Sequence, residues 1–300
     1  LRVRLGPISL ANPVLSASGT FGYGAEVERF FWPGVLGAIV GKTVTLEPRE
    51  GNPSPRMAET AAGMLNTIGL QNPGLDHFVS AILPRMLQYG NPVLVNIAGR
   101  SVDEFVELAA RLDDVEGPAA LELNLSCPNV ARGGMSFSTT PRAAEEVCSR
   151  VAAATERPFY AKLTPNTANV GSVARACEAG GAAGISAINT LMGMAIDWRG
   201  RRPLLSTATG GLSGPAIKPV ALRVVHEVYR SVSIPVMGIG GARTAEDVLE
   251  FMVAGASAVQ IGTATFVDPL AIPKVLQDLP RLLEEQGVGS VRELTGTLAT

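Results

Sequence analysis

Short runs of β-branched and other apolar residues alternate along the chain with longer segments whose apolar residues recur at helical spacing. The short runs predict strands at Val14–Ser18, Ala38–Thr43, Val93–Ala98, Ala120–Leu125, Phe159–Leu163, Gly184–Asn189, Pro235–Ile239 and Ala258–Gly262. The longer segments predict helices at Ala25–Phe31, Leu75–Leu87, Val102–Leu112, Pro141–Ala154, Val170–Ala179, Pro215–Tyr229, Ala245–Ala254 and Pro269–Glu285. Repeated strand-then-helix units with no linker favour one α/β domain over residues 1–300, a (β/α)8 TIM barrel. A doubly wound open sheet is the competing architecture.

Three segments outside this alternation complete the predicted fold. Residues 3–10 precede the first unit and predict a short N-terminal β-hairpin that could close the bottom of the barrel. Two connections, residues 44–74 and 190–214, are much longer than ordinary loops of a compact domain. Connections of that length are usually functional or mobile, so we expect long active-site loops there.

Composition and charge narrow the class of protein. The chain is 46% hydrophobic and 17% charged, which is typical of a globular domain with a large core. Its 25 basic and 27 acidic residues give a net charge of −2, so a broad basic surface for nucleic acid is not expected. Cysteines are odd in number, at 127, 148 and 177, without metal-ligand spacing, and only two histidines occur. We therefore expect no metal site and a reducing, cytoplasmic location. Residues 1–7 lack the apolar run of a signal peptide, and the longest uncharged stretches, 179–196 and 251–267, are too polar for a membrane span, so we expect neither.

Polar side chains gather toward the carboxyl ends of the predicted strands. Glu122, Asn124 and Ser126 share one face of their strand, and Asn96, Lys162, Lys42 and Asn189-Thr190 end others. Each has a structural explanation when taken alone; Lys162, for example, could pair with Glu122 inside the barrel. Together they predict a polar small-molecule site, with lysines for an anion and amides for a planar heterocycle.

Glycine-rich turns follow the last two predicted strands. Gly240-Gly241 comes after the seventh strand, and Gly262-Thr263 ends the eighth. In (β/α)8 enzymes these loops commonly bind a phosphate through backbone N–H groups, where glycine permits close approach. Two ordinary tight turns are the alternative reading.

Cys127 directly follows the fourth predicted strand, whereas Cys148 and Cys177 fall in helical patterns typical of core positions. Without a histidine nearby in sequence, Cys127 is better interpreted as a proton acceptor or a redox-sensitive thiol than as an acyl nucleophile. His77 and His226 lie in helical segments, where surface or packing roles are expected.

Three segments resemble motifs of the dihydroorotate dehydrogenase family, in the same order along the chain. They are NTIGLQNPG at 66–74, NLSCPN at 124–129 and TGGLSGPAIKP at 209–219. The family is a flavin (β/α)8 barrel that oxidises dihydroorotate to orotate in pyrimidine biosynthesis. Cysteine rather than serine at 127 resembles the soluble class 1. The 209–219 segment resembles the heteromeric, NAD-linked branch (class 1B) rather than the fumarate-using homodimers.

The resemblance implies roles for individual residues. It makes Cys127 the catalytic base that takes the C5 proton. It implies that one FMN per chain contacts Ser18, Lys42, Thr43, Asn96, Asn124, Lys162, Ile188, Gly214, Gly240, Gly241, Gly262 and Thr263. It implies that substrate contacts Lys42, Asn66, Thr67, Ile68, Gly69, Leu70, Asn124, Asn129, Asn189 and Thr190.

The resemblance also implies partners. In the NAD-linked branch a second subunit carries FAD and a [2Fe–2S] cluster, so we expect a homodimer that joins such subunits in a heterotetramer. Four alternatives stay open: a fumarate-linked homodimeric dihydroorotate dehydrogenase; another flavin barrel acting on dihydropyrimidines, such as dihydropyrimidine dehydrogenase; a flavin-free phosphate-binding barrel; and a non-catalytic barrel that supports a partner.

Overall fold

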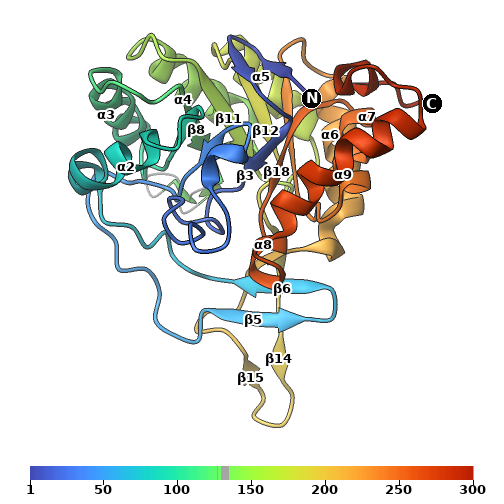
Figure 1. Cartoon of the computed structure of the whole chain (residues 1–300). Coiled ribbons are helices and arrows are strands. Elements are labelled where there is room, and N and C mark those ends of the chain that lie inside the picture. The colour runs from blue at the N-terminus through green and yellow to red at the C-terminus, as the bar shows by residue number, and fades with distance from the viewer. Residues whose placement is uncertain (127, 130–134, 300) are drawn as a thin grey trace.

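A computed structural model describes residues 1–126, 128–129 and 135–299 of the chain. Its centre is a sheet of eight parallel strands, and a bridge between Leu15 and Ala38 closes it into a barrel (Figure 1). The strands follow one another around the barrel in chain order: β3 Val14–Ser16, β4 Ile39–Val40, β7 Val93–Ile97, β8 Ala120–Asn124, β11 Phe159–Leu163, β12 Gly184–Ala187, β17 Val236–Ile239 and β18 Ala256–Ile261. The TIM barrel prediction is confirmed. Most strands end earlier than predicted.

From β4 onward, helices cover the outside of the barrel between successive strands, whereas β3 and β4 are joined by turns and a short 3-10 segment (Figure 1). The α-helices are α1 Leu75–His77, α2 Leu83–Leu87, α3 Val102–Asp113, α4 Pro141–Ala152, α5 Val170–Ala179, α6 Lys218–Tyr229, α7 Ala245–Val253, α8 Ala264–Val267 and α9 Ala271–Glu285. A π-helical segment, Phe78–Ile82, joins α1 to α2, and 3-10 turns occur at Pro33–Val35, Phe137–Thr139, Pro215–Ile217 and Val291–Leu294.

One predicted helix is wrong. Residues 25–31 form turns rather than a helix. Gly22 and Gly24, with φ of 65° and 103°, lead the chain into this segment through left-handed backbone, and Pro33 then begins a 3-10 turn. Left-handed residues interrupt α-helical hydrogen bonding, so the apolar spacing alone was not sufficient to form a helix.

The N-terminal hairpin lies at the amino ends of the barrel strands, as predicted. It pairs β1 (Val3–Leu5) with β2 (Ile8–Leu10), and its alternate apolar side chains are buried. Gly6 approaches Ala183 and Pro235, which directly precede β12 and β17. The hydroxyl of Tyr160 donates to the Leu5 carbonyl at 2.6 Å, which ties the hairpin to β11.

The two long connections pair with each other at the opposite end of the barrel. They form an antiparallel sheet in the order β13–β16–β6–β5, whose strands are β5 Met57–Thr60, β6 Gly63–Asn66, β13 Leu191–Gly193 and β16 Gly210–Ser213. A further hairpin, β14 (Ile196–Asp197) with β15 (Arg202–Pro203), extends beyond it (Figure 1). This extension stands at the carboxyl ends of the barrel strands, where TIM-barrel sites are built. The short pair β9 (Pro128–Asn129) and β10 (Met135–Ser136) follows β8.

No helix in the described part of the chain is long and apolar enough to cross a membrane.

Candidate active site

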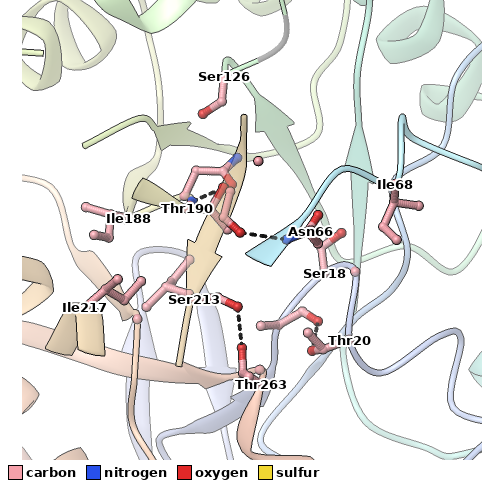
Figure 2. Close-up of a pocket in the computed structure, with 18 of the residues that line it drawn as sticks. Ser18, Thr20, Asn66, Ile68, Ser126, Ile188, Thr190, Ser213, Ile217 and Thr263 are labelled. Atoms are coloured by element: carbon pink, nitrogen blue, oxygen red, sulfur yellow. Dashed lines mark hydrogen bonds between the residues drawn. The ribbon is translucent and has the colours of Figure 1, made fainter. Parts of the chain in front are cut away.

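A cavity of about 660 Å³ opens between the barrel and the extension (Figure 2). Barrel strand ends form one wall and the β5–β6 and β13–β16 strands form the other. Nearly all of the residues predicted for the cofactor and substrate share it: Ser18, Lys42, Thr43, Asn66, Thr67, Ile68, Gly69, Leu70, Asn124, Lys162, Ile188, Asn189, Thr190, Gly214, Gly240, Gly241, Gly262 and Thr263. Side chains from distant parts of the sequence therefore meet at one place.

Three predicted residues stand apart from this group. Asn96 is buried within the barrel and does not line the cavity. Cys127 lies outside the described residues. Asn129 belongs to β9, but its side chain is likewise outside what the structure describes.

Glycines form one end of the cavity. Gly240 and Gly241, with φ of 129° and 84°, turn the chain after β17. A Cβ on Gly241 would lie 2.8 Å from the Gly214 carbonyl oxygen, and one on Gly214 would lie 2.7 Å from the Cα of Gly63. Left-handed backbone and close backbone approach both require glycine here. Nearby, the hydroxyls of Ser213 and Thr263 are 2.8 Å apart and join β16 to the end of β18 (Figure 2).

Two lysines give the cavity a positive charge. Lys162, on β11, is 5% exposed and lies 3.5 Å from a carboxylate oxygen of Glu122. Lys42, after β4, makes no ion pair with any described residue. Burial lowers the pKa of Lys42, and the nearby positive charges of Arg56 and Lys162 lower it further. Lys42 thus offers a positive charge that is not paired with any described carboxylate, which favours an anionic ligand.

Amide side chains are oriented by hydrogen bonds at the edge of the cavity. Asn66, at the end of β6, donates to the Gly211 carbonyl of β16 at 3.3 Å (Figure 2). Asn189 donates to Oδ1 of Asn124 at 3.1 Å and accepts from the backbone N–H of Thr190 at 2.8 Å. Fixed amides at several points around a cavity suit a ligand whose edge alternates donors and acceptors.

Comparison with known proteins identifies the family. The model of the dihydroorotate dehydrogenase family matches residues 1–283. The chain belongs to the dihydroorotate dehydrogenase family. It is 52% identical over 296 residues to "Dihydroorotate dehydrogenase B (NAD(+)), catalytic subunit" of Geobacillus kaustophilus, which covers 99% of this chain and 95% of the relative. Proteins of the same name from Listeria monocytogenes (49%; 98% of this chain and 97% of the relative) and Bacillus cereus (50%; 99% and 96%) are similar too.

These similarities confirm the predicted resemblance to dihydroorotate dehydrogenases, and in particular to the NAD-linked catalytic subunits. The chain is therefore an oxidoreductase of this family.

Sequence reasoning missed several residues of the dihydroorotate dehydrogenase cavity. Asn166, after β11, donates to the Thr190 carbonyl at 3.1 Å and accepts from the N–H of Met192 at 2.9 Å, so it holds β13 beside the barrel. Its place just beyond a strand end was the available signal. Met57, Met192 and Phe266 also line the cavity although each is exposed, and nothing in their local sequence marks them.

Proposed function

We propose that this chain binds one FMN in the cavity and oxidises (S)-dihydroorotate to orotate in the synthesis of UMP. The observation that carries the proposal is the shared cavity. Glycine turns suited to a phosphate lie in the same space as two lysines and several fixed amides. A flavin mononucleotide with a small anionic heterocycle beside it needs this combination of groups.

The volume and the lining residues of the cavity fit FMN. A volume of about 660 Å³ lies within the roughly 300–1,000 Å³ typical of ligand sites. Glycine at 214 and 241 lets the turns after β16 and β17 pack closely against each other at this end of the cavity, and glycine turns of this kind commonly bind a phosphate. We assign the phosphate end to Gly214, Gly240, Gly241, Gly262 and Thr263. We assign the flavin ring to Ser18, Lys42, Thr43, Asn124, Lys162 and Ile188, with Asn96 behind them.

The chain's own residues bind the substrate and move a proton. Dihydroorotate becomes orotate by losing a proton from C5 and a hydride from C6, and FMN, when bound, supplies the hydride acceptor. Lys42 attracts the substrate carboxylate, and Asn66, Asn124 and Asn189 bind its alternating N–H and C=O groups. Cys127 accepts the C5 proton. We place the remaining substrate contacts at Thr67, Ile68, Gly69, Leu70, Asn129 and Thr190.

Electrons then pass to NAD through a partner subunit. Two observations support this: the similar proteins are named NAD(+)-linked catalytic subunits, and the three cysteines in this sequence are too few for the usual four ligands of a [2Fe–2S] cluster. We propose a homodimer joined to subunits that carry FAD and the cluster. The reducing cytoplasm suits the buried thiols of Cys148 and Cys177.

Reconstitution with FMN followed by assay with dihydroorotate and a redox dye tests the proposal. We expect visible flavin absorbance in the purified protein and formation of orotate. A protein that cannot retain FMN would favour the flavin-free phosphate barrel. Bound FMN with turnover of another dihydropyrimidine alone would favour a different flavin barrel.

A further inference from the structure

Glu122 lies at the centre of the barrel, in the middle of β8, and is fully buried. Its carboxylate accepts hydrogen bonds from the Asn96 amide at 2.5 Å, the Ser186 hydroxyl at 2.7 Å and the Gln260 amide at 2.6 Å. The Lys162 ammonium is its fourth partner, at 3.5 Å. These partners come from β7, β12, β18 and β11, so one side chain joins four strands besides its own.

Every partner of Glu122 offers a hydrogen, as an ionised carboxylate requires. A buried carboxylate is tolerated only when it is paired and hydrogen-bonded, and Lys162 is the cation that forms an ion pair with it among the described residues. Lys162 in turn makes no hydrogen bond to another described residue. The position of its ammonium inside the barrel therefore depends on Glu122.

Glu122 also decides how two amides are oriented. Because Asn96 and Gln260 both give their NH2 groups to the carboxylate, their carbonyl oxygens are left buried and without a partner in the described chain. A buried acceptor without a donor costs free energy, and such groups in native structures usually serve a purpose. The carboxylate thus fixes the orientation of both amides in the barrel interior.

We propose that Glu122 is a positioning residue for the flavin site. It does not line the cavity, whereas Lys162 does, so it acts through Lys162. The inference rests on the proposed function, because it takes the cavity to bind FMN. In this role Glu122 holds the Lys162 ammonium at the place on β11 where FMN would meet it.

A double-mutant cycle on FMN affinity tests this role. Lys162→Ala, Glu122→Gln and the double variant are purified, stripped of FMN and titrated by flavin fluorescence. In the wild-type background, Lys162→Ala is expected to weaken FMN binding by roughly tenfold or more. In the Glu122→Gln background the same change is expected to cost less than about threefold, because the ammonium is no longer held in place.

A purely structural role for Glu122 predicts a different result. Removing a core carboxylate would lower the melting temperature of the apoprotein and leave the Lys162→Ala effect on FMN affinity unchanged. Two results would overturn the inference while leaving the proposed function intact. One is that the effects of Lys162→Ala and Glu122→Gln on FMN affinity are additive. The other is that Lys162→Ala in the wild-type background does not change FMN affinity. A wild-type protein that binds no FMN would overturn both.

Two further variants keep the cycle informative. If Glu122→Gln does not fold, Glu122→Asp keeps the charge but withdraws it from Lys162, and the same loss of coupling is expected. Ser186→Ala is the matched control, since it removes one hydrogen bond from the carboxylate and leaves the carboxylate and Lys162 in place. In this control the Lys162→Ala effect should stay close to its wild-type size. Loss of coupling there as well would contradict the proposal.

Discussion

Asn189 donates its side-chain amide to Oδ1 of Asn124 at 3.1 Å, across the space between the ends of β12 and β8. The Asn189 amide cannot flip to present its oxygen to Asn124, because that Oδ1 already accepts from the backbone N–H of Thr190. The pair therefore has one orientation. It leaves the NH2 group of Asn124 as a donor, with no acceptor among the described residues, in the wall of the cavity.

Asn124→Asp should weaken orotate binding by roughly 10- to 100-fold, because the substitution replaces a donor with a second acceptor and adds a negative charge. The contact with Asn189 survives, since Asp still accepts. Isothermal titration of the FMN-loaded protein with orotate measures the effect. The control is Asn169→Asp, the same change at the exposed N-cap of α5, where Asp caps equally well. Equal affinities in the two variants would show that Asn124 does not face the ligand.

Lys42 should give orotate binding a pH dependence. The ammonium must be charged to attract the anion, and burial together with Arg56 and Lys162 lowers its pKa below the ordinary 10.5. Affinity should therefore be constant below the lowered pKa and fall as the pH rises through it. Titration of the FMN-loaded protein with orotate across alkaline pH measures the profile.

Lys42→Arg is the control for this profile, because guanidinium stays charged throughout the range. Any titration of the ligand itself appears in both proteins. The fall in affinity that is specific to the wild type should disappear in Lys42→Arg. Parallel profiles would mean that Lys42 does not contact the anion.

Gly241→Ala should weaken FMN binding strongly, by at least about tenfold. The substitution adds backbone strain at φ 84° and places a Cβ 2.8 Å from the Gly214 carbonyl oxygen. Gly90→Ala is the matched control, because Gly90 has φ 81° but open space around it. Fluorescence titration of each apoprotein with FMN separates lost contact from backbone strain. Similar losses in both variants would remove Gly241 from the phosphate site.

Tyr160→Phe should lower the free energy of unfolding by about 1–3 kcal/mol, because the Leu5 carbonyl loses its 2.6 Å donor in a buried place. Chemical denaturation followed by circular dichroism measures it. Tyr229→Phe removes a hydroxyl that makes no hydrogen bond within the described chain, and it should change stability much less. A Tyr160→Phe variant as stable as the control would mean that the hairpin is held by apolar contacts alone.

The barrel was predictable because each strand and helix carries its own apolar period, as in Phe159–Leu163 and Val170–Ala179, where predicted and observed bounds agree. The pairing of the two long connections was not. It depends on contacts such as Leu65 with Leu212, which lie far apart in sequence and share no local signal. The helix predicted at residues 25–31 does not form for a different reason: the left-handed glycines before it outweigh the apolar spacing.

The sequence was sufficient to predict which residues gather at the candidate site, but not the contacts that they make there. Strand-end residues such as Lys42 and Asn189 line the cavity because parallel strands bring their carboxyl ends together. The Glu122–Lys162 pair was one expected alternative and is present, yet Lys162 lines the cavity as well, so the structural and functional readings do not exclude each other. Gln260 and Ser186 as partners of Glu122 were not predicted, because registers between non-adjacent strands are not encoded locally.

Cys127→Ser should keep the fold and FMN but slow dihydroorotate oxidation by ~10²–10⁴-fold at neutral pH, the usual contribution of a positioned base. A hydroxyl is a far weaker acid than a thiol, so the rate of the variant should rise more steeply with pH. Cys148→Ser and Cys177→Ser are the controls. Both thiols are buried, on α4 and α5, so these changes should lower stability and leave the rate nearly unchanged.

Anaerobic stopped-flow mixing of the FMN-loaded protein with dihydroorotate tests the proposed reaction most directly, because it needs neither NAD nor a partner subunit. The account predicts rapid loss of the visible flavin absorbance in the wild type, with orotate formed in equal amount, and slow loss in Cys127→Ser. An unchanged spectrum in the wild type with FMN bound, or wild-type bleaching in Cys127→Ser across the whole pH range, would contradict it.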